Sequence, residues 1–220
     1  MALQTNALIT LSRLKLDLAI NASDTSSDAQ LTNYINAASD QIEGLCNRRF
    51  KQESYTHRLT GKGDSYIIFE QFPVTTLTSV NNDDKWIFGS GTELVVDTQV
   101  SVDKETFLVR RGLCNPWKTM PMAVKVTYTA GYDAIPEGLQ QACVEYCRYL
   151  YVSQSSRRLG ISQVSKSGET ATFEDTIPYM IKFLIEPYTR EAYVKKALQL
   201  NGVMIFPDVK KEEKSEGVLR

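Results

Sequence analysis

The stretch Val124–Ala142 reads VKVTYTAGYDAIPEGLQQA and is the most informative part of this sequence for the fold. Its first half alternates apolar and polar residues, which is the period-two pattern of a β-strand with one buried face. Gly131 indicates a turn, and Pro136 suits the first position of a helix, where its missing N–H leaves no bond unmade. The apolar stripe that follows predicts a helix over about residues 136–153. A strand therefore leads directly into a helix.

Two further helices are expected on either side of this junction. The 3.6-residue period of apolar residues predicts a helix over about 28–47, with Ser27 as N-cap and Gln30 completing a capping box. Arg48 and Arg49 follow, where cations favour the helix dipole. Another helix is expected over about 177–190, and Pro187 should kink or end it. The segment Leu8–Ile20 is ambiguous between helix and strand, and we favour a helix.

Between residues 51 and 130 the sequence is rich in short β-type runs separated by turn residues. The expected strands are Tyr55–Leu59, Tyr66–Phe69, Leu77–Val80, Lys85–Phe88, Glu93–Val96, Thr106–Val109 and Ala123–Thr129. The predicted fold class is therefore α+β, with a mainly helical core and a small antiparallel β subdomain inserted at about 53–130.

Composition excludes several classes of protein. The chain has 220 residues, a net charge of −1 and 42% hydrophobic residues, which is typical of a globular domain. Because there is no basic excess, a large sequence-independent grip on nucleic acid is not expected. No stretch approaches the roughly 18 apolar residues of a transmembrane helix, so no membrane partner is expected.

A search for catalytic and metal-binding motifs finds none, so we expect no enzyme activity, no metal and no cofactor. His57 is the only histidine and has no nucleophile motif beside it. Cys143 and Cys147 share a helix face, but packing explains them better than metal binding. Gly61-Lys62-Gly63 lacks the spacing of a phosphate-binding loop and predicts a β-turn.

Four stretches resemble the head–tail connector (head-completion adaptor) family of tailed bacteriophages. They are the segment 11–20 with the helix that ends at Cys46-Asn47-Arg48-Arg49-Phe50, the runs Leu59–Gly61, Ile67–Phe69 and Phe72–Val80, the junction Val124–Ala142, and Ile177–Arg190 with its Pro-Tyr-Thr-Arg ending. Thr189 interrupts the family's Pro-Tyr-Arg pattern. The resemblance covers about residues 8–190.

The resemblance implies a structural, non-enzymatic subunit of a ring of twelve copies. Such a ring docks under the portal, extends the DNA channel and provides the platform for neck or tail attachment. The implied partners are other copies of the chain, the portal protein, the next neck or tail-completion protein and, transiently, the viral DNA. The implied location is the neck of the virion, between capsid and tail, after synthesis in the cytoplasm of the bacterial host.

Within this reading, residues 1–190 form the connector domain, with the β-rich insertion at 51–130. Residues 191–220 form a C-terminal extension that is partly disordered until it docks on a partner. Its apolar patch gives the candidate portal-binding residues Val203, Met204, Ile205 and Phe206. Arg157, Arg158 and Lys166 lie in a segment without acidic residues and are the candidate channel-facing or DNA-facing residues.

Three alternatives remain at this stage. The first is another neck or tail-completion ring protein. The second is a DNA-binding packaging accessory protein, supported by the basic segment between Arg148 and Lys166. The third is a hydrolase with a non-obvious site, which the single histidine disfavours.

Overall fold

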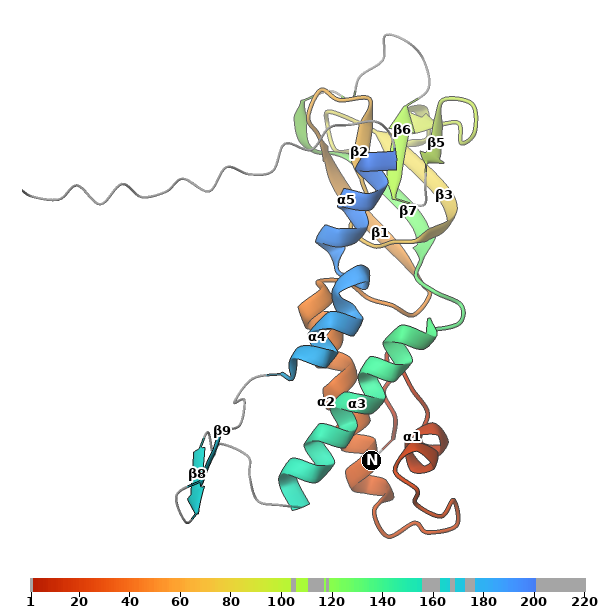
Figure 1. Cartoon of the computed structure of the whole chain (residues 1–220). Helices are drawn as coiled ribbons and strands as arrows, with labels where there is room; N and C mark the ends of the chain where they lie inside the picture. Colours follow the sequence, from red (N-terminus) through yellow and green to blue (C-terminus); the bar gives the residue numbers. More distant parts are fainter. Residues whose placement is uncertain are drawn as a thin grey trace, which may run out of the picture.

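The computed structural model describes residues 2–103, 106–110, 117, 119–155, 163–166, 169–172 and 177–200. Helices gather at one end of the molecule and the two larger β-sheets at the other, and the helices α4 (Tyr179–Ile185) and α5 (Arg190–Leu200) run from one end to the other (Figure 1). Each end has its own hydrophobic core.

The helical end consists of α1 (Leu11–Asp17), α2 (Asp28–Cys46), α3 (Glu137–Ser155) and α4 (Tyr179–Ile185). Helix α3 packs against the other three helices. Their apolar stripes meet in one core, because residues spaced by three and four positions share a helix face. The fully buried members of this core are Leu14, Leu31, Ile35, Ala38, Ile42, Cys46, Phe50, Leu139, Ala142, Cys143, Val144 and Cys147.

The connection between α1 and α2 is held by a buried lysine. Lys15 is 5% exposed, and its Nζ lies 2.5 Å from the Asp28 carboxylate and 2.8 Å from the Asp24 carbonyl. A buried ammonium group is stable only when it is paired and hydrogen-bonded. This lysine therefore fixes the polar loop to the start of α2.

The β end contains two antiparallel sheets. The four-stranded sheet has the order β1 (Glu53–Gly61), β7 (Met120–Ala130), β3 (Val74–Asn82) and β4 (Glu93–Leu94), and the single-turn helix η1 (Ser90–Thr92) precedes β4. The three-stranded sheet has the order β2 (Tyr66–Ile68), β6 (Phe107–Arg110) and β5 (Val100–Asp103). A separate hairpin joins β8 (Gln163–Lys166) to β9 (Glu169–Thr172).

The central strand β7 shows the predicted alternation. Val124, Val126 and Tyr128 are at most 1% exposed, whereas Lys125 and Thr127 are half-buried on the other face. The buried face meets Val80 of its own sheet and Val100 and Leu108 of the three-stranded sheet, and Phe69 and Trp117 from the connecting segments complete the cluster. The β end therefore has a hydrophobic core of its own.

Gly131 links the two cores. Its φ of +110° suits a residue without a side chain. Its N–H donates to the Pro73 carbonyl, and the next N–H, that of Tyr132, donates to the Phe50 carbonyl at 2.7 Å. The strand therefore turns toward the helices through a point where three backbone segments are in contact.

The predicted fold class was wrong in its proportions. The protein is not a mainly helical core with a small inserted β subdomain, because two antiparallel sheets enclose a core of their own. Short, irregular strands gave weak sequence patterns, so their combined size was underestimated. The expected strand Lys85–Phe88 is a loop, with Trp86 and Phe88 in the left-handed region, whereas the strand Val100–Asp103 was missed.

The predicted helices also differ in detail. Helices α2 and α3 lie close to the expected 28–47 and 136–153, but the expected helix 177–190 is interrupted. It consists of α4 and the short 3-10 turn η2 (Glu186–Tyr188), after which α5 (Arg190–Leu200) begins. Pro187 lies in that turn, where a missing N–H ends the α-helical pattern. Ser27 precedes α2 without a side-chain capping bond, so the predicted capping box is absent there.

Candidate docking cleft and exposed apolar surfaces

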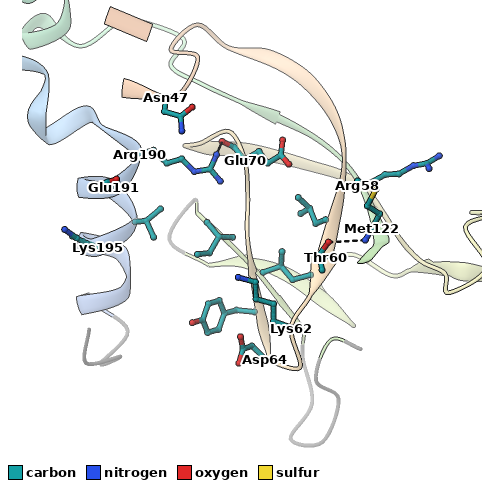
Figure 2. Close-up of a pocket in the computed structure, with 15 residues that line it drawn as sticks. Asn47, Arg58, Thr60, Lys62, Asp64, Glu70, Met122, Arg190, Glu191 and Lys195 are labelled. Carbon is teal, nitrogen blue, oxygen red and sulfur yellow. Dashed lines mark hydrogen bonds between the residues drawn. The ribbon is translucent and has the colours of Figure 1, made fainter. Parts of the chain in front are cut away.

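An open cleft of about 840 Å³ lies between α5 and the edges of both sheets. Strand β1 is an edge strand of the four-stranded sheet, and β2 is an edge strand of the three-stranded sheet. Figure 2 shows α5 on one side of the cleft and the strands on the other. The apolar residues that line it are Leu59, Tyr66, Ile67, Ile68, Met122 and Val194.

The polar lining of the cleft is mostly charged. Four cations, Arg58, Lys62, Arg190 and Lys195, are accompanied by the three anions Asp64, Glu70 and Glu191. Arg190 points toward Glu70 and donates to its backbone carbonyl at 3.3 Å (Figure 2). An apolar floor with a charged rim suits the docking of a peptide segment.

The position of α5 beside the cleft depends on Tyr193. Its ring stacks on Phe72 with centroids 4.7 Å apart and an interplanar angle of 28°. The Arg48 guanidinium lies 5.1 Å from the Tyr193 ring and 4.3 Å from the Phe72 ring. The aromatic pair and the arginine therefore connect α5 to the β end and to the end of α2.

Arg48 is the most enclosed charge at this junction. It is 3% exposed, its Nη2 donates to the Phe72 carbonyl at 2.6 Å, and the rings of Phe50 and Tyr132 also lie within 5.5 Å. Burial lowers the pKa of the guanidinium from its ordinary value, and the neighbouring Tyr132 opposes that shift. The sequence predicted that Arg48 interacts with the dipole at the C-terminal end of the helix. In the structure its main partners are aromatic rings.

A patch of exposed apolar side chains covers one face of α4. Tyr179, Met180 and Phe183 are 70%, 63% and 56% exposed, and the rings of Tyr179 and Phe183 are stacked. The opposite face of α4 is buried through Ile181 and Ile185. Large apolar side chains gathered on one exposed helix face are typical of an interaction surface.

A second exposed apolar surface is built on the loop after β3. Trp86 and Ile87 are 51% and 76% exposed, and Trp86 Nε1 donates to the Pro121 carbonyl. The buried Asp83 carboxylate accepts three backbone N–H groups, those of Lys85, Ile87 and Phe88, at 2.8–2.9 Å. These bonds lower the pKa of Asp83 below its ordinary 3.8. One carboxylate therefore organises the loop, which we name the Asp83 loop.

Acidification should open the Asp83 loop. Because the folded-state pKa is lowered, the carboxylate stabilises the loop fully above pH 3.8, and this contribution is lost as the pH falls through the folded-state pKa. We expect a change in Trp86 fluorescence below pH 3.8, before far-UV circular dichroism changes. Asp83→Asn should remove that pH dependence, and Trp86→Phe should remove the signal. A transition that persists in Asp83→Asn would contradict this role.

The residues proposed from sequence lie in several places. The candidate portal-binding residues Val203, Met204, Ile205 and Phe206 lie outside the described residues, as do Arg157 and Arg158. Lys166 is the last residue of β8. His57 lies on β1 with Nδ1 2.9 Å from the Tyr128 hydroxyl, and Cys143 and Cys147 are buried in the helical core.

The Gly61-Lys62-Gly63 motif lies at the end of a strand. Gly61 is the last residue of β1, and the next element after the motif is strand β2. A phosphate-binding loop would be followed by a helix instead. The cleft, the Arg48 site and the α4 patch were not found by sequence reasoning. The apolar residues of the α4 patch were visible in the sequence, but the pattern of Ile177–Arg190 did not tell which of its faces is covered.

An open cleft and exposed apolar side chains on α4 and on the Asp83 loop are typical of a protein that assembles with other proteins. The sequence matches the model of the family "Head completion protein" over residues 7–191, and the chain belongs to that family. It is a structural subunit of the head–tail connector of a phage-type particle, which agrees with the resemblance noted above.

Three solved structures share the fold. A chain from the neck of an empty gene transfer agent particle, computed with C6 symmetry, has a TM-score of 0.55 and 18% identity over 86% of this chain and 93% of that chain. Chains from the native gene transfer agent virion and from its neck, computed with C12 symmetry, have TM-scores of 0.53 and 0.52. Both are 19% identical over 86% of this chain and 92% of their own.

No curated protein shows a significant sequence match. In the part of the chain that the structure describes, no helix has both the length and the apolar character needed to cross a membrane.

Proposed function

We propose that the chain assembles into a closed ring of twelve copies in the neck of the particle. The family assignment supports a place in the neck, and the likeness to a neck chain computed with C12 symmetry supports the number of copies. The ring docks under the portal, extends the channel through which DNA passes and forms the platform for the next neck or tail-completion protein. No covalent chemistry is part of this role.

The α4 patch is the observation that carries the proposal. A closed ring of identical subunits needs an interface between two different surfaces of the same chain. An interface can cover Tyr179, Met180 and Phe183 at a small cost in desolvation free energy, because the patch carries few charges. In the ring, this patch packs against the neighbouring copy.

The other residues predicted from the sequence contact the portal and the DNA in this ring. Val203, Met204, Ile205 and Phe206 anchor the C-terminal extension on the portal. Arg157, Arg158 and Lys166 face the channel and make a few weak contacts with DNA, because a strong electrostatic grip would hinder sliding. Residues 1–190 are the connector domain in this arrangement, and α5 begins at its end.

A charge placed in the α4 patch should weaken assembly. Phe183→Asp should weaken ring formation on isolated portal by on the order of tenfold or more, because the carboxylate loses its water when the interface closes. Electron microscopy of the chain with portal, together with a pull-down, measures this effect. Val95→Asp is the matched control, since Val95 is 58% exposed but lies on the β end.

The outcomes separate the parts of the proposal. Rings that form equally well with Phe183→Asp would exclude the α4 patch as the subunit interface. Binding of the wild-type chain to tail tube, with none to portal, would favour another neck or tail-completion ring protein.

A further inference from the structure

The cleft beside α5 leaves two strand edges without a neighbouring strand. In the described sheets, β1 pairs only with β7, and β2 pairs only with β6. Residues 58–60 of β1 and 66–68 of β2 line the cleft in succession, so the backbone of each edge borders it beside the apolar floor of Leu59, Ile67 and Val194. An extended peptide that enters the cleft can add to such an edge and bury its own apolar side chains.

The chain itself carries a segment of this kind directly after α5. Leu200 is followed by Asn201-Gly202, a dipeptide that strongly favours a reversal of the chain. Val203-Met204-Ile205-Phe206 comes next and is rich in β-branched and aromatic residues, as strands are. Pro207 then ends the run, because it has no N–H to donate to a ladder.

The length of the segment also fits the cleft. Four extended residues span on the order of 13 Å, which is comparable with the three-residue strand β2. Since α5 lines the cleft through Val194 and Lys195, a reversal after Leu200 returns the chain alongside α5 toward the cleft.

We propose that Val203–Phe206 occupies the cleft of its own chain as an added strand before assembly, and that the portal displaces it. This inference rests on the proposed role of the same four residues as the portal anchor. A single contact then covers an apolar segment and two open strand edges, each of which favours aggregation when exposed. The cleft thus regulates the anchor by competing with the portal for it.

Hydrogen exchange on the full-length chain tests the intramolecular contact. The N–H groups of Arg58–Thr60 and Tyr66–Ile68 that point into the cleft should exchange at least tenfold faster in Ile205→Asp than in the wild type. Val218→Asp is the matched control in the same tail and should leave their exchange unchanged. A synthetic peptide of residues 201–210, added to Ile205→Asp, should restore the slow exchange.

Portal binding is measured separately on the same samples. Adding portal to the wild type should accelerate exchange at the cleft edges, because the anchor leaves the cleft. Equal exchange in wild type and Ile205→Asp would overturn the inference while leaving portal docking intact. Protection that rises with protein concentration would assign the segment to a second copy and also overturn it. Protected edges in a chain that does not bind portal would refute the competition and the proposed docking together.

Discussion

Replacing Gly131 with alanine should destabilise the protein by about 3 kcal/mol or more. The φ of +110° at this residue is strained for any side chain, and a Cβ would lie 2.4 Å from the Lys51 carbonyl oxygen. The Cβ would also lie 2.6 Å from the Lys51 carbonyl carbon and 2.8 Å from the Gln52 nitrogen. All three atoms belong to the backbone, so no side-chain rotation can relieve the contacts. The change should also weaken the bonds from Gly131 to Pro73 and from Tyr132 to Phe50, which join strand β7 to the helices.

Urea denaturation measures this loss, and Gly44→Ala provides the control. Gly44 lies in α2, and an added Cβ there has no atom within 4 Å. Alanine should stabilise that helix by up to about 1 kcal/mol, because glycine has the greater freedom in the unfolded chain. A Gly131→Ala protein within 1 kcal/mol of the wild type would show that the junction relaxes more easily than its geometry indicates.

Truncation of Arg48 should have a similarly large effect. Arg48→Ala removes a buried side chain in contact with four aromatic rings and leaves a cavity, which should cost about 3 kcal/mol. It also removes the hydrogen bond to the Phe72 carbonyl. Because Tyr193 packs on the same site, α5 should separate from the β end before the rest of the protein unfolds.

Hydrogen exchange of residues 190–200 reports the release of α5, and urea denaturation reports global stability. Arg58→Ala is the matched control, since Arg58 is exposed and its guanidinium lies 5.0 Å from the Phe88 ring. It should cost less than about 1 kcal/mol. Arg48→Met keeps much of the volume without the charge and should restore part of the stability. Equal effects of Arg48→Ala and Arg58→Ala would exclude a special role for the buried site.

Local patterns predicted the elements with strong periodicity. Helices α2 and α3 and strand β7 have regular apolar spacing, and each was expected close to where it lies. The loop at Trp86 was mistaken for a strand, because Lys85–Phe88 has strand composition while Asp83 imposes its turn from outside that window. The size of the β end was likewise underestimated, since pairing between β3 and β7 depends on residues far apart in the chain.

The sequence alone determined the family, the strand-to-helix junction at Gly131 and the apolar segment after α5, because each is encoded by neighbouring residues. The tertiary structure decided which residues from distant parts of the chain pack against these segments. Arg48 and Phe50 are two residues apart in the chain, but Phe72, Tyr132 and Tyr193 reach Arg48 only through the fold. The cleft and the α4 patch arise in the same way. Whether a strand edge or an apolar face is covered depends on which distant segments pack against it.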